Sequence, residues 1–364
     1  MNDWSDLQGE HIRFERKGSA AIIRLDRPRA LNSLTLPMVR AMKLALKRFA
    51  DDPAISCVVL TGEGERGLCA GGDIRIIHDL GKARDLDVTR FWREEFPLNA
   101  MIAHFPKPYV ALMDGITMGG GVGIAAHGSI RVVTERTRLA MPETGIGYFP
   151  AVGATWLLAR APGETGTWLG LTGNEIGAED AVFAGLADHV VPSAELADLL
   201  AALSRLPPGS SIAEAAAVAR RFARDGAEGL LSRNQDLIDR TFGLDDVSSI
   251  LAGLEKEASD FAQETLAALR KRSPTSLKLA LRLLRLGRAS ASLEECLERE
   301  FSAAVHILDG HDFYEGVRAA LIDKDRAPKW SPATLEAVSD DTIDAYLVSR
   351  QAPLFQGRKE VNGS

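Results

Sequence analysis

The sequence has little cysteine, no long hydrophobic run and no excess of positive charge. Its three cysteines, Cys57, Cys69 and Cys296, are odd in number and lack the spacing of a metal site, which suits a reducing compartment rather than a disulfide scaffold. No apolar run approaches the ~18 residues that a membrane helix needs, so we expect no membrane partner. A net charge of -7 argues against nucleic-acid binding.

The first ten residues also lack the features of a targeting segment. Met1 to Glu10 carry acidic and polar side chains, without the apolar stretch of a secretory signal or the arginines of a transit peptide. The sequence therefore predicts a cytoplasmic protein. It contains no ligand cluster with metal spacing, so we expect no metal site.

Hydrophobic residues, by contrast, make up 46% of the 364 positions, which is enough to bury one large domain or two moderate ones. The best boundary candidate is Leu206–Ser211, where two prolines meet glycine and serine. We expect a core over residues 1–206 and a helical region over residues 207–364, which covers the active site or forms subunit contacts.

The chain is organised around Met113 to Arg160. Three consecutive glycines, Gly119 to Gly121, follow the strand-like run Val110–Met113 and precede the small apolar run Val122–Ala126. This order predicts a strand that leads through a glycine turn into a helix. Because the first N–H groups of a helix have no internal acceptor, such a turn can hold an oxyanion.

A second glycine turn has the same character. Cys69 to Asp73 follows the β-type run Ser56–Leu60 and carries Gly71 and Gly72. Either turn alone is more simply a tight strand-to-helix connection. Two N–H groups that converge on one carbonyl oxygen would polarise it and stabilise the negative charge that develops there.

One acid, Glu143, stands close to these turns in the sequence. It precedes a charge-free run, Gly145 to Leu158, so we expect its carboxylate to lie against apolar walls that raise its pKa. In isolation a helix cap or a surface acid would be the simpler interpretation. Beside two oxyanion-type turns, a catalytic carboxylate is favoured.

The remaining patterns place the other candidates. Arg27 and Arg29 lie in a loop as possible phosphate contacts, although a solvated charge is the simpler role for at least one of them. A helical stretch over Asp87–Phe105 carries Glu94 and Glu95, which cannot both face inward because neighbours on a helix sit about 100° apart. We expect an interruption of this helix at Pro97.

Other elements follow from periodicity and caps. Thr35 is predicted to cap a helix whose first turn holds Pro37 and whose buried stripe includes Met38 and Phe49. Further strands are expected at Ser19–Leu25, Ser56–Thr61 and His189–Pro192. Helices are expected at Ile74–Leu80, Ile212–Arg224, Val247–Arg270, Pro274–Leu286 and Leu293–Leu308.

Several segments together resemble the crotonase superfamily, whose members bind acyl-CoA thioesters and stabilise an enolate or a tetrahedral oxyanion with two backbone N–H groups. The matching segments are Asp26–Pro28, Asn32–Leu34, Cys69–Ile74, Gly119–Gly121 and Pro142–Glu143. The resemblance implies an α/β (α+β) fold, a crotonase-like spiral of β-β-α turns with a helical C-terminal region. Members often form trimers or pairs of trimers, so a homo-oligomer is possible.

Within that superfamily the sequence is most similar to the 3-hydroxyisobutyryl-CoA hydrolases, over nearly its whole length. The segments that carry this likeness are Phe91–Phe96, Gly115–Gly123, Met141–Thr144, Phe313–Arg318, Leu321–Asp325 and Pro328–Trp330. The resemblance implies hydrolysis of a short branched 3-hydroxyacyl-CoA. It implies no cofactor, since coenzyme A is part of the substrate.

The resemblance also assigns roles. It implies that Ala70 or its neighbour Gly71, together with Gly120 in the Gly119–Gly121 turn, supplies the oxyanion donors. It implies that Glu95 and Glu143 face the acyl group and that Glu143 is the catalytic carboxylate. The first of the two glutamates used by hydratases falls at Gly123 here, which counts against simple hydration.

One departure from the hydrolase pattern is Ala151, where that family usually carries an aspartate. Alanine can neither accept a hydrogen bond from a substrate hydroxyl nor handle a proton, and the loss of one such group costs about 10²- to 10⁴-fold in rate. Two alternatives therefore stay open beside hydrolysis. One is an enoyl-CoA double-bond isomerase that uses Glu143 alone, and the other is an acyl-CoA-binding protein without turnover.

Overall fold

Two β-sheets form the centre of the fold, and the strands from β3 to β8 join them alternately. The structure, a computed structural model, describes residue 4 and residues 7–355, so most of the segment Met1–Glu10 discussed above lies outside it. The larger sheet runs, in spatial order, β1 (Ile12–Lys17), β2 (Ala20–Leu25), β3 (Cys57–Gly62), β5 (Tyr109–Met113), β7 (Ile130–Val133) and β9 (His189–Val190). The smaller sheet consists of β4 (Gly67–Cys69), β6 (Ile116–Met118) and β8 (Arg138–Ala140).

The order of these strands along the chain produces a spiral. β3, β5 and β7 join the larger sheet, and the strand that follows each of them, β4, β6 or β8, joins the smaller one. All these neighbours pair in parallel, and only β1 runs antiparallel to its partner β2. The expected fold, a crotonase-like spiral of β-β-α turns, is confirmed.

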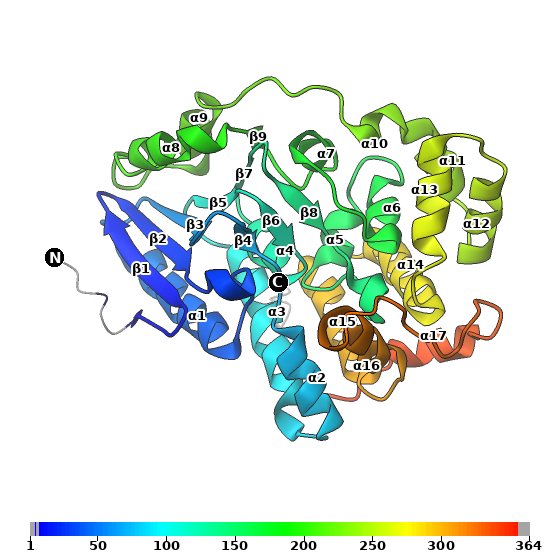
Figure 1. The fold of residues 1–364 in the computed structure, drawn as a ribbon. Coiled ribbons are helices and arrows are strands. Elements are labelled where there is room, and N and C mark those ends of the chain that lie inside the picture. Colours follow the sequence, from blue (N-terminus) through cyan, green and yellow to red (C-terminus); the bar gives the residue numbers. More distant parts are fainter. Residues whose placement is uncertain (1–3, 5–6, 356–364) are drawn as a thin grey trace, which may run out of the picture.

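Both faces of the larger sheet are covered, which explains the nearly continuous apolar strands. On one face, Val59, Val110 and Val132 pack against α8 (Leu196–Leu203) and α9 (Ile212–Arg220). The opposite face belongs to the main core, which continues into the C-terminal helices. Figure 1 shows α8 and α9 over one side of the sheet, with α10 to α17 gathered at the other end of the molecule.

The first long helix, α1 (Leu36–Asp51), begins as its sequence predicts. The Thr35 side chain accepts a hydrogen bond from the N–H of Met38 at 3.5 Å, and Pro37 lies in the first turn. Met38 and Phe49 are fully buried on its inner stripe. A cap and an apolar stripe were therefore sufficient to fix this element.

The expected break at Pro97 does not occur. α3 (Arg90–Ala103) runs through Pro97 without interruption. A proline inside a helix removes one backbone hydrogen bond, and here Phe96 and Leu98, which flank it, are fully buried and hold the helix in place. Tertiary packing thus outweighs the local cost.

The second half of the chain is helical, as expected. Its longer helices are α9, α11 (Gln235–Phe242), α12 (Val247–Glu255), α13 (Asp260–Leu269), α14 (Pro274–Ala289) and α15 (Leu293–Ile307). The single helix expected over Val247–Arg270 is two helices, because Ser259 caps α13 by accepting a hydrogen bond from the N–H of Ala262. The division after residue 206 stays a prediction about separate folding units.

Shorter helices fill the remaining connections. They are α2 (Ile74–Lys82), α4 (Gly120–Ala125), α5 (Ala154–Leu158), α6 (Thr165–Thr172), α7 (Ala178–Phe183), α10 (Leu230–Arg233), α16 (Asp312–Val317) and α17 (Asp340–Tyr346). A 3₁₀ turn, η4 (Glu143–Ile146), follows β8. Three of these elements, α2, α4 and η4, begin just after the strands of the smaller sheet.

Candidate active site

The three segments predicted to form the site follow three neighbouring strands. In the smaller sheet Cys69 pairs with Thr117, and Met118 pairs with Ala140. Because β4, β6 and β8 are parallel, their carboxyl ends lie at the same edge of the sheet. The two glycine turns and Glu143 begin there, so segments far apart in the sequence meet at one point.

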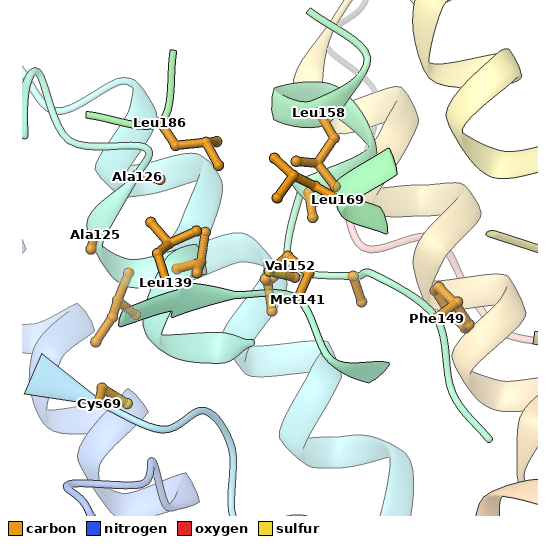
Figure 2. Close-up of a cluster of buried hydrophobic side chains, with 14 of the residues drawn as sticks. Cys69, Ala125, Ala126, Leu139, Met141, Phe149, Val152, Leu158, Leu169 and Leu186 are labelled. Carbon is orange, nitrogen blue, oxygen red and sulfur yellow. The ribbon is translucent and has the colours of Figure 1, made fainter. Parts of the chain in front are cut away.

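An apolar layer supports this edge of the sheet. Figure 2 shows Leu139 and Met141, at the end of β8, beside Val152, with Leu158 and Leu169 above them. All five side chains are buried in the main core. The backbone that carries the site therefore rests on packed side chains rather than on solvent-exposed loops.

The two glycine turns approach each other too closely for side chains. A Cβ at Gly121 would lie 2.2 Å from the carbonyl oxygen of Cys69, and one at Gly120 would lie 3.1 Å from the backbone nitrogen of Gly72. Gly119 has a φ of 51° and Gly71 a φ of 106°, conformations that glycine adopts without strain. The predicted convergence of the two turns is confirmed.

The structure corrects one of the expected donors. The N–H of Ala70 donates a hydrogen bond to the carbonyl oxygen of Leu31 at 3.0 Å, so it is not available to a ligand. The N–H of Gly71 points to the Cys69 sulfur at 3.4 Å, which is a weak acceptor.

The available donors are the N–H groups of Gly72 and Gly120. Among the described residues neither donates a hydrogen bond to a protein acceptor. Gly120 is the first residue of α4, where helix geometry leaves the N–H without an internal partner. The candidate donor in the first glycine turn is therefore Gly72 rather than Ala70, and Gly120 remains the candidate in the second turn.

Glu143 lies where a charged carboxylate is costly. It is 9% exposed, and its Oε2 has no hydrogen-bond partner within the described residues. A Cβ at Gly119 would lie 3.0 Å from its Oε1, so the carboxyl group faces the second glycine turn. Burial, together with the nearby Glu300 and Glu95 carboxyl groups, raises the pKa of Glu143 to about 8.

Glu94 and Glu95 face different sides of α3, as the helical spacing requires. Glu94 binds Arg40 at 2.6 and 2.8 Å near the surface, and this hydrogen-bonded pair lowers its pKa. Glu95 is 2% exposed, and burial raises its pKa to about 8. A Cβ at Gly120 would lie 2.7 Å from Glu95 Oε1, so this carboxyl group also reaches the glycine turn.

These groups surround a cavity of about 90 Å³. Ala70, Gly71, Gly72, Gly119 and Gly120 line one side of it, and Glu95, Glu143, Tyr148 and Ala151 line the others. Apolar walls come from Phe91, Trp92, Phe96 and Ile146. A cavity of this size has room for a short acyl chain. A larger surface groove beside α2 and α16 contains none of these groups.

The loop that carries Ala151 is fixed from behind by an acid of the C-terminal region. Glu300, on α15, accepts hydrogen bonds from the N–H of Gly153 at 2.7 Å and from the N–H and hydroxyl of Thr155 at 3.0 and 2.6 Å. His127 Nε2 contacts the carbonyl oxygen of Val152 at 2.8 Å. Burial lowers the pKa of His127 to about 4, so it is a packed neutral histidine.

Gly123 has no room for the side chain of a second catalytic acid. A Cβ there would lie 2.6 Å from the Cβ of Val152 and 3.0 Å from Nδ2 of Asn99. A glutamate at this place would require both neighbours to move. The absence of that acid is therefore built into the packing as well as into the sequence.

The two arginines proposed as phosphate contacts differ. Arg27 binds the carboxylate of Asp73 at 2.8 Å and the Ser33 hydroxyl at 2.8 Å, which ties its loop to the first glycine turn. Arg29 is exposed to solvent. Neither lines the cavity, so a phosphate contact stays a prediction for both.

In the part of the chain that the structure describes, no group of three or more histidine, cysteine or acidic side chains is arranged to hold a metal ion. Within the same residues, no helix combines the length and the apolar character needed to cross a membrane.

The fold and the two glycine turns define the class of protein. Residues 20–347 match the enoyl-CoA hydratase/isomerase family, and the chain belongs to that family. The crotonase-like resemblance of the sequence is thereby confirmed.

Individual relatives are similar over nearly the whole chain. The mitochondrial 3-hydroxyisobutyryl-CoA hydrolase of Danio rerio is 44% identical over 349 residues, which cover 95% of this chain and 91% of the relative. The human protein of the same name is 42% identical, with coverage of 93% and 89%.

Two solved structures are also similar, but they carry different names. A carnitinyl-CoA dehydratase from Mycobacterium thermoresistibile has a TM-score of 0.89 and 39% identity, covering 95% of this chain and 98% of its own. An enoyl-CoA hydratase from Rhodobacter sphaeroides has a TM-score of 0.85 and 43% identity, with coverage of 94% and 98%. The choice between these chemistries depends on the site residues.

Three residues of the site were missed in the sequence. Gly72 was inside the predicted turn, but its choice as the donor in place of Ala70 depends on the hydrogen bond from the Ala70 N–H to the carbonyl oxygen of Leu31. Glu300 did leave a signal, because it is an acid within the apolar stripe of α15. Tyr148 lies in the charge-free run after Glu143, where the sequence predicts that an aromatic side chain belongs to the hydrophobic core.

Proposed function

We propose that this protein hydrolyses a short branched 3-hydroxyacyl-CoA thioester of the 3-hydroxyisobutyryl-CoA type to the free acid and coenzyme A. The observation that carries the proposal is the buried Glu143 carboxyl group, whose Oε2 has no hydrogen-bond partner among the described residues, in one cavity with Gly72 and Gly120, whose N–H groups are free. The names and high coverage of the hydrolase relatives support the same reaction.

The geometry suggests how the groups act. The thioester carbonyl oxygen accepts hydrogen bonds from the N–H groups of Gly72 and Gly120, which makes the carbonyl carbon more electrophilic. The Glu143 carboxylate then attacks that carbon to form a mixed anhydride, or takes a proton from a water that attacks it. The C–S bond breaks, and coenzyme A leaves as the thiolate. In the anhydride route a water molecule then cleaves the bond between the acyl group and Glu143, which releases the free acid and restores the carboxylate.

The features around Glu143 support hydrolysis over hydration. Hydration in this superfamily uses two glutamates, and the place of the first is taken by Gly123, whose surroundings leave no space for an acid. The cavity has room for a short acyl group. Double-bond isomerisation needs only one acid, but no relative named above is an isomerase, and that alternative is not favoured.

The test is release of free thiol from 3-hydroxyisobutyryl-CoA, with Glu143→Gln as the matched control. We expect the chain as it stands to release thiol, and the variant to do so at about 10²- to 10⁴-fold lower rate. An Ala151→Asp version measured in parallel asks whether the missing aspartate limits turnover. Thiol release by neither version would contradict the proposal, and a shift of a double bond without thiol release would establish the isomerase instead.

Three further points belong to the proposal. We propose that no cofactor is required beyond the coenzyme A of the substrate. The cytoplasmic location stays a prediction, since the hydrolase relatives carry the word mitochondrial in their names. The possible homo-oligomer also stays a prediction, and analytical ultracentrifugation of the purified chain tests it.

A further inference from the structure

Tyr148 places a buried hydroxyl group beside the catalytic acids, and the mechanism above does not use it. Its side chain is 3% exposed and lines the same cavity as Glu143 and Ala151. Among the described residues its hydroxyl group has no hydrogen-bond partner. A buried donor without an acceptor costs about 1–3 kcal/mol, so a ligand that accepts its hydrogen bond would recover that free energy.

The ring of Tyr148 is held rigidly. It stacks on Trp92, with centroids 5.7 Å apart and planes 18° apart, and on Phe149, with values of 4.5 Å and 19°. Phe313 packs against it at 5.9 Å. The backbone N–H of Tyr148 donates a hydrogen bond to the carbonyl oxygen of Glu143 at 3.0 Å. The hydroxyl group is therefore fixed relative to Glu143 before any ligand binds, which lowers the entropic cost of using it.

The surroundings keep this hydroxyl group protonated. Three buried carboxyl groups act on it electrostatically, those of Glu95, Glu300 and Glu143. Burial and these acids hold the pKa of Tyr148 well above its ordinary value. None of the three accepts a hydrogen bond from it in the described structure. Tyr148 thus adds a side-chain donor to a cavity whose other donors are the backbone N–H groups of Gly72 and Gly120.

We propose that the Tyr148 hydroxyl group donates a hydrogen bond to the 3-hydroxyl oxygen of the bound acyl group and makes the site selective for hydroxyacyl over plain acyl thioesters. The inference rests on the proposed function for the identity of the substrate. It also accounts for Ala151, because Tyr148 lies on the same loop and supplies a polar contact that alanine cannot make.

The experiment compares two substrates that differ only in this hydroxyl group, 3-hydroxyisobutyryl-CoA and isobutyryl-CoA. We expect Tyr148→Phe to lower kcat/KM for the hydroxylated substrate by about 5- to 100-fold, the range for a buried donor left without its partner. For isobutyryl-CoA, which offers no acceptor there, kcat/KM should stay within about 2-fold. Equal losses on both substrates, or no loss on either, would overturn the proposal.

A second tyrosine provides the control. Tyr109 is fully buried on β5, and its hydroxyl group donates to the carbonyl oxygen of Ile124 at 3.0 Å, away from the cavity lining. Tyr109→Phe removes the same atom and a structural hydrogen bond. It should lower stability without changing the ratio of the two kcat/KM values.

Calorimetric binding separates this inference from the proposed function. If the unaltered protein hydrolyses neither thioester, the hydrolase proposal fails, but the two dissociation constants still report recognition of the hydroxyl group. We then expect tighter binding of 3-hydroxyisobutyryl-CoA by about 5-fold or more, and loss of that preference in Tyr148→Phe. Equal affinities in the unaltered protein would overturn the role of Tyr148.

Discussion

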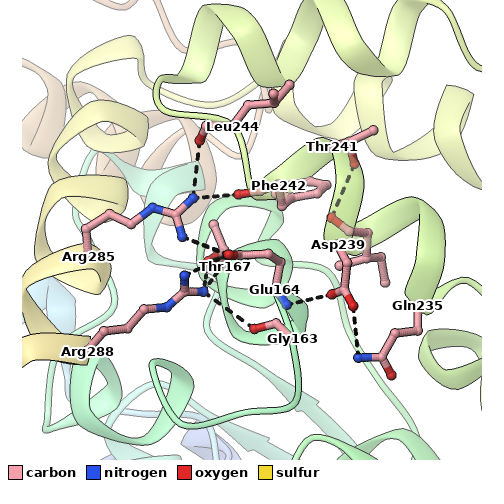
Figure 3. Close-up of polar contacts among 11 residues, drawn as sticks. Gly163, Glu164, Thr167, Gln235, Asp239, Thr241, Phe242, Leu244, Arg285 and Arg288 are labelled. Atoms are coloured by element: carbon pink, nitrogen blue, oxygen red, sulfur yellow. Dashed lines mark hydrogen bonds and ion pairs between the residues drawn. The ribbon is translucent and has the colours of Figure 1, made fainter.

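Two glutamates, the half-buried Glu164 and the buried Glu143, lie where the C-terminal helices meet the first half of the chain, and their surroundings are built in opposite ways. At the first, Glu164 accepts hydrogen bonds from Arg285 at 2.9 Å, from Arg288 at 2.7 Å and from the Thr167 hydroxyl at 2.6 Å; Figure 3 shows these contacts. At the second, Glu143 has an oxygen without a partner in the described chain, although α15 approaches it through Glu300.

The pKa values of the two glutamates reflect this difference. Burial alone would raise the pKa of Glu164, but hydrogen bonds from Arg288, Thr167 and Arg285 lower it overall. Burial and the nearby carboxyl groups of Glu300 and Glu95 raise the pKa of Glu143 to about 8. An acid that is paired with cations helps to hold helices together. An acid without such partners can instead gain interactions when a ligand binds. The same substitution at each should therefore have opposite consequences.

The largest expected effect is on activity, at Glu143. Glu143→Gln preserves the shape of the side chain but removes the carboxylate that, in the proposed mechanism, attacks the thioester or activates water. We expect thiol release to fall by about 10²- to 10⁴-fold. Stability should be unchanged or improved near pH 8, because a buried acid without a partner is gone. A variant that unfolds more readily would show that Glu143 has a structural role.

The next effect concerns the oxyanion donors. A Cβ at Gly120 would lie 2.7 Å from Glu95 Oε1 and 3.1 Å from the Gly72 nitrogen, so Gly120→Ala should displace the turn. We expect a loss of about 10²- to 10³-fold in kcat, as for removal of one oxyanion donor. Gly226→Ala is the control, since a Cβ there meets only Glu179 at 3.9 Å. Similar losses in both would remove the special status of the Gly120 turn.

Glu164→Gln tests whether the first of the two glutamates has a structural role. It leaves the guanidinium groups of Arg285 and Arg288 without their carboxylate. We expect the free energy of unfolding to fall by about 1.5–3 kcal/mol, the value of hydrogen bonds to charged groups. Thiol release should stay within about 2-fold. Urea unfolding followed by circular dichroism, with kinetics on the same samples, provides both numbers. A large loss of activity in a folded variant would contradict the division of roles.

Much of the site could be predicted from the sequence, since its signals are local. Strand, glycine turn and helix follow one another at Gly119–Gly121 and at Cys69–Asp73, and the charge-free run after Glu143 correctly predicted a buried acid. That Glu94 and Glu95 do not both face inward followed from helix geometry alone.

What the sequence could not provide depends on contacts between distant segments. The use of the Ala70 N–H is decided by Leu31, so the choice of Gly72 as the donor required the folded chain. Continuity of α3 through Pro97 depends on packing that surrounds it. Likewise, the distance between Tyr148 and the acids follows from how α3, the loop and α16 meet.

The smallest expected effect is a pH dependence whose sign differs between the two acids. Glu143 must be ionised to act, and its pKa is about 8, so the rate of thiol release should rise with pH, by about 10-fold between pH 6 and pH 7, and level off above about 8. Background hydrolysis is removed by subtracting the rate of Glu143→Gln. A rate that is constant from pH 5 upward would contradict the raised pKa.

The pH dependence of folding stability should reflect the same raised pKa of Glu143. The folded protein raises the pKa of Glu143 from its ordinary 4.5 to about 8, so this group contributes stability that is fully present below about pH 4.5 and is lost as the pH rises through about 8. For Glu164 the pKa is lowered, so its contribution is present above about pH 4.5 and is lost on acidification. Measured against their glutamine variants, the two differences in unfolding free energy should therefore change with pH in opposite directions, and parallel changes would show that both acids are paired alike.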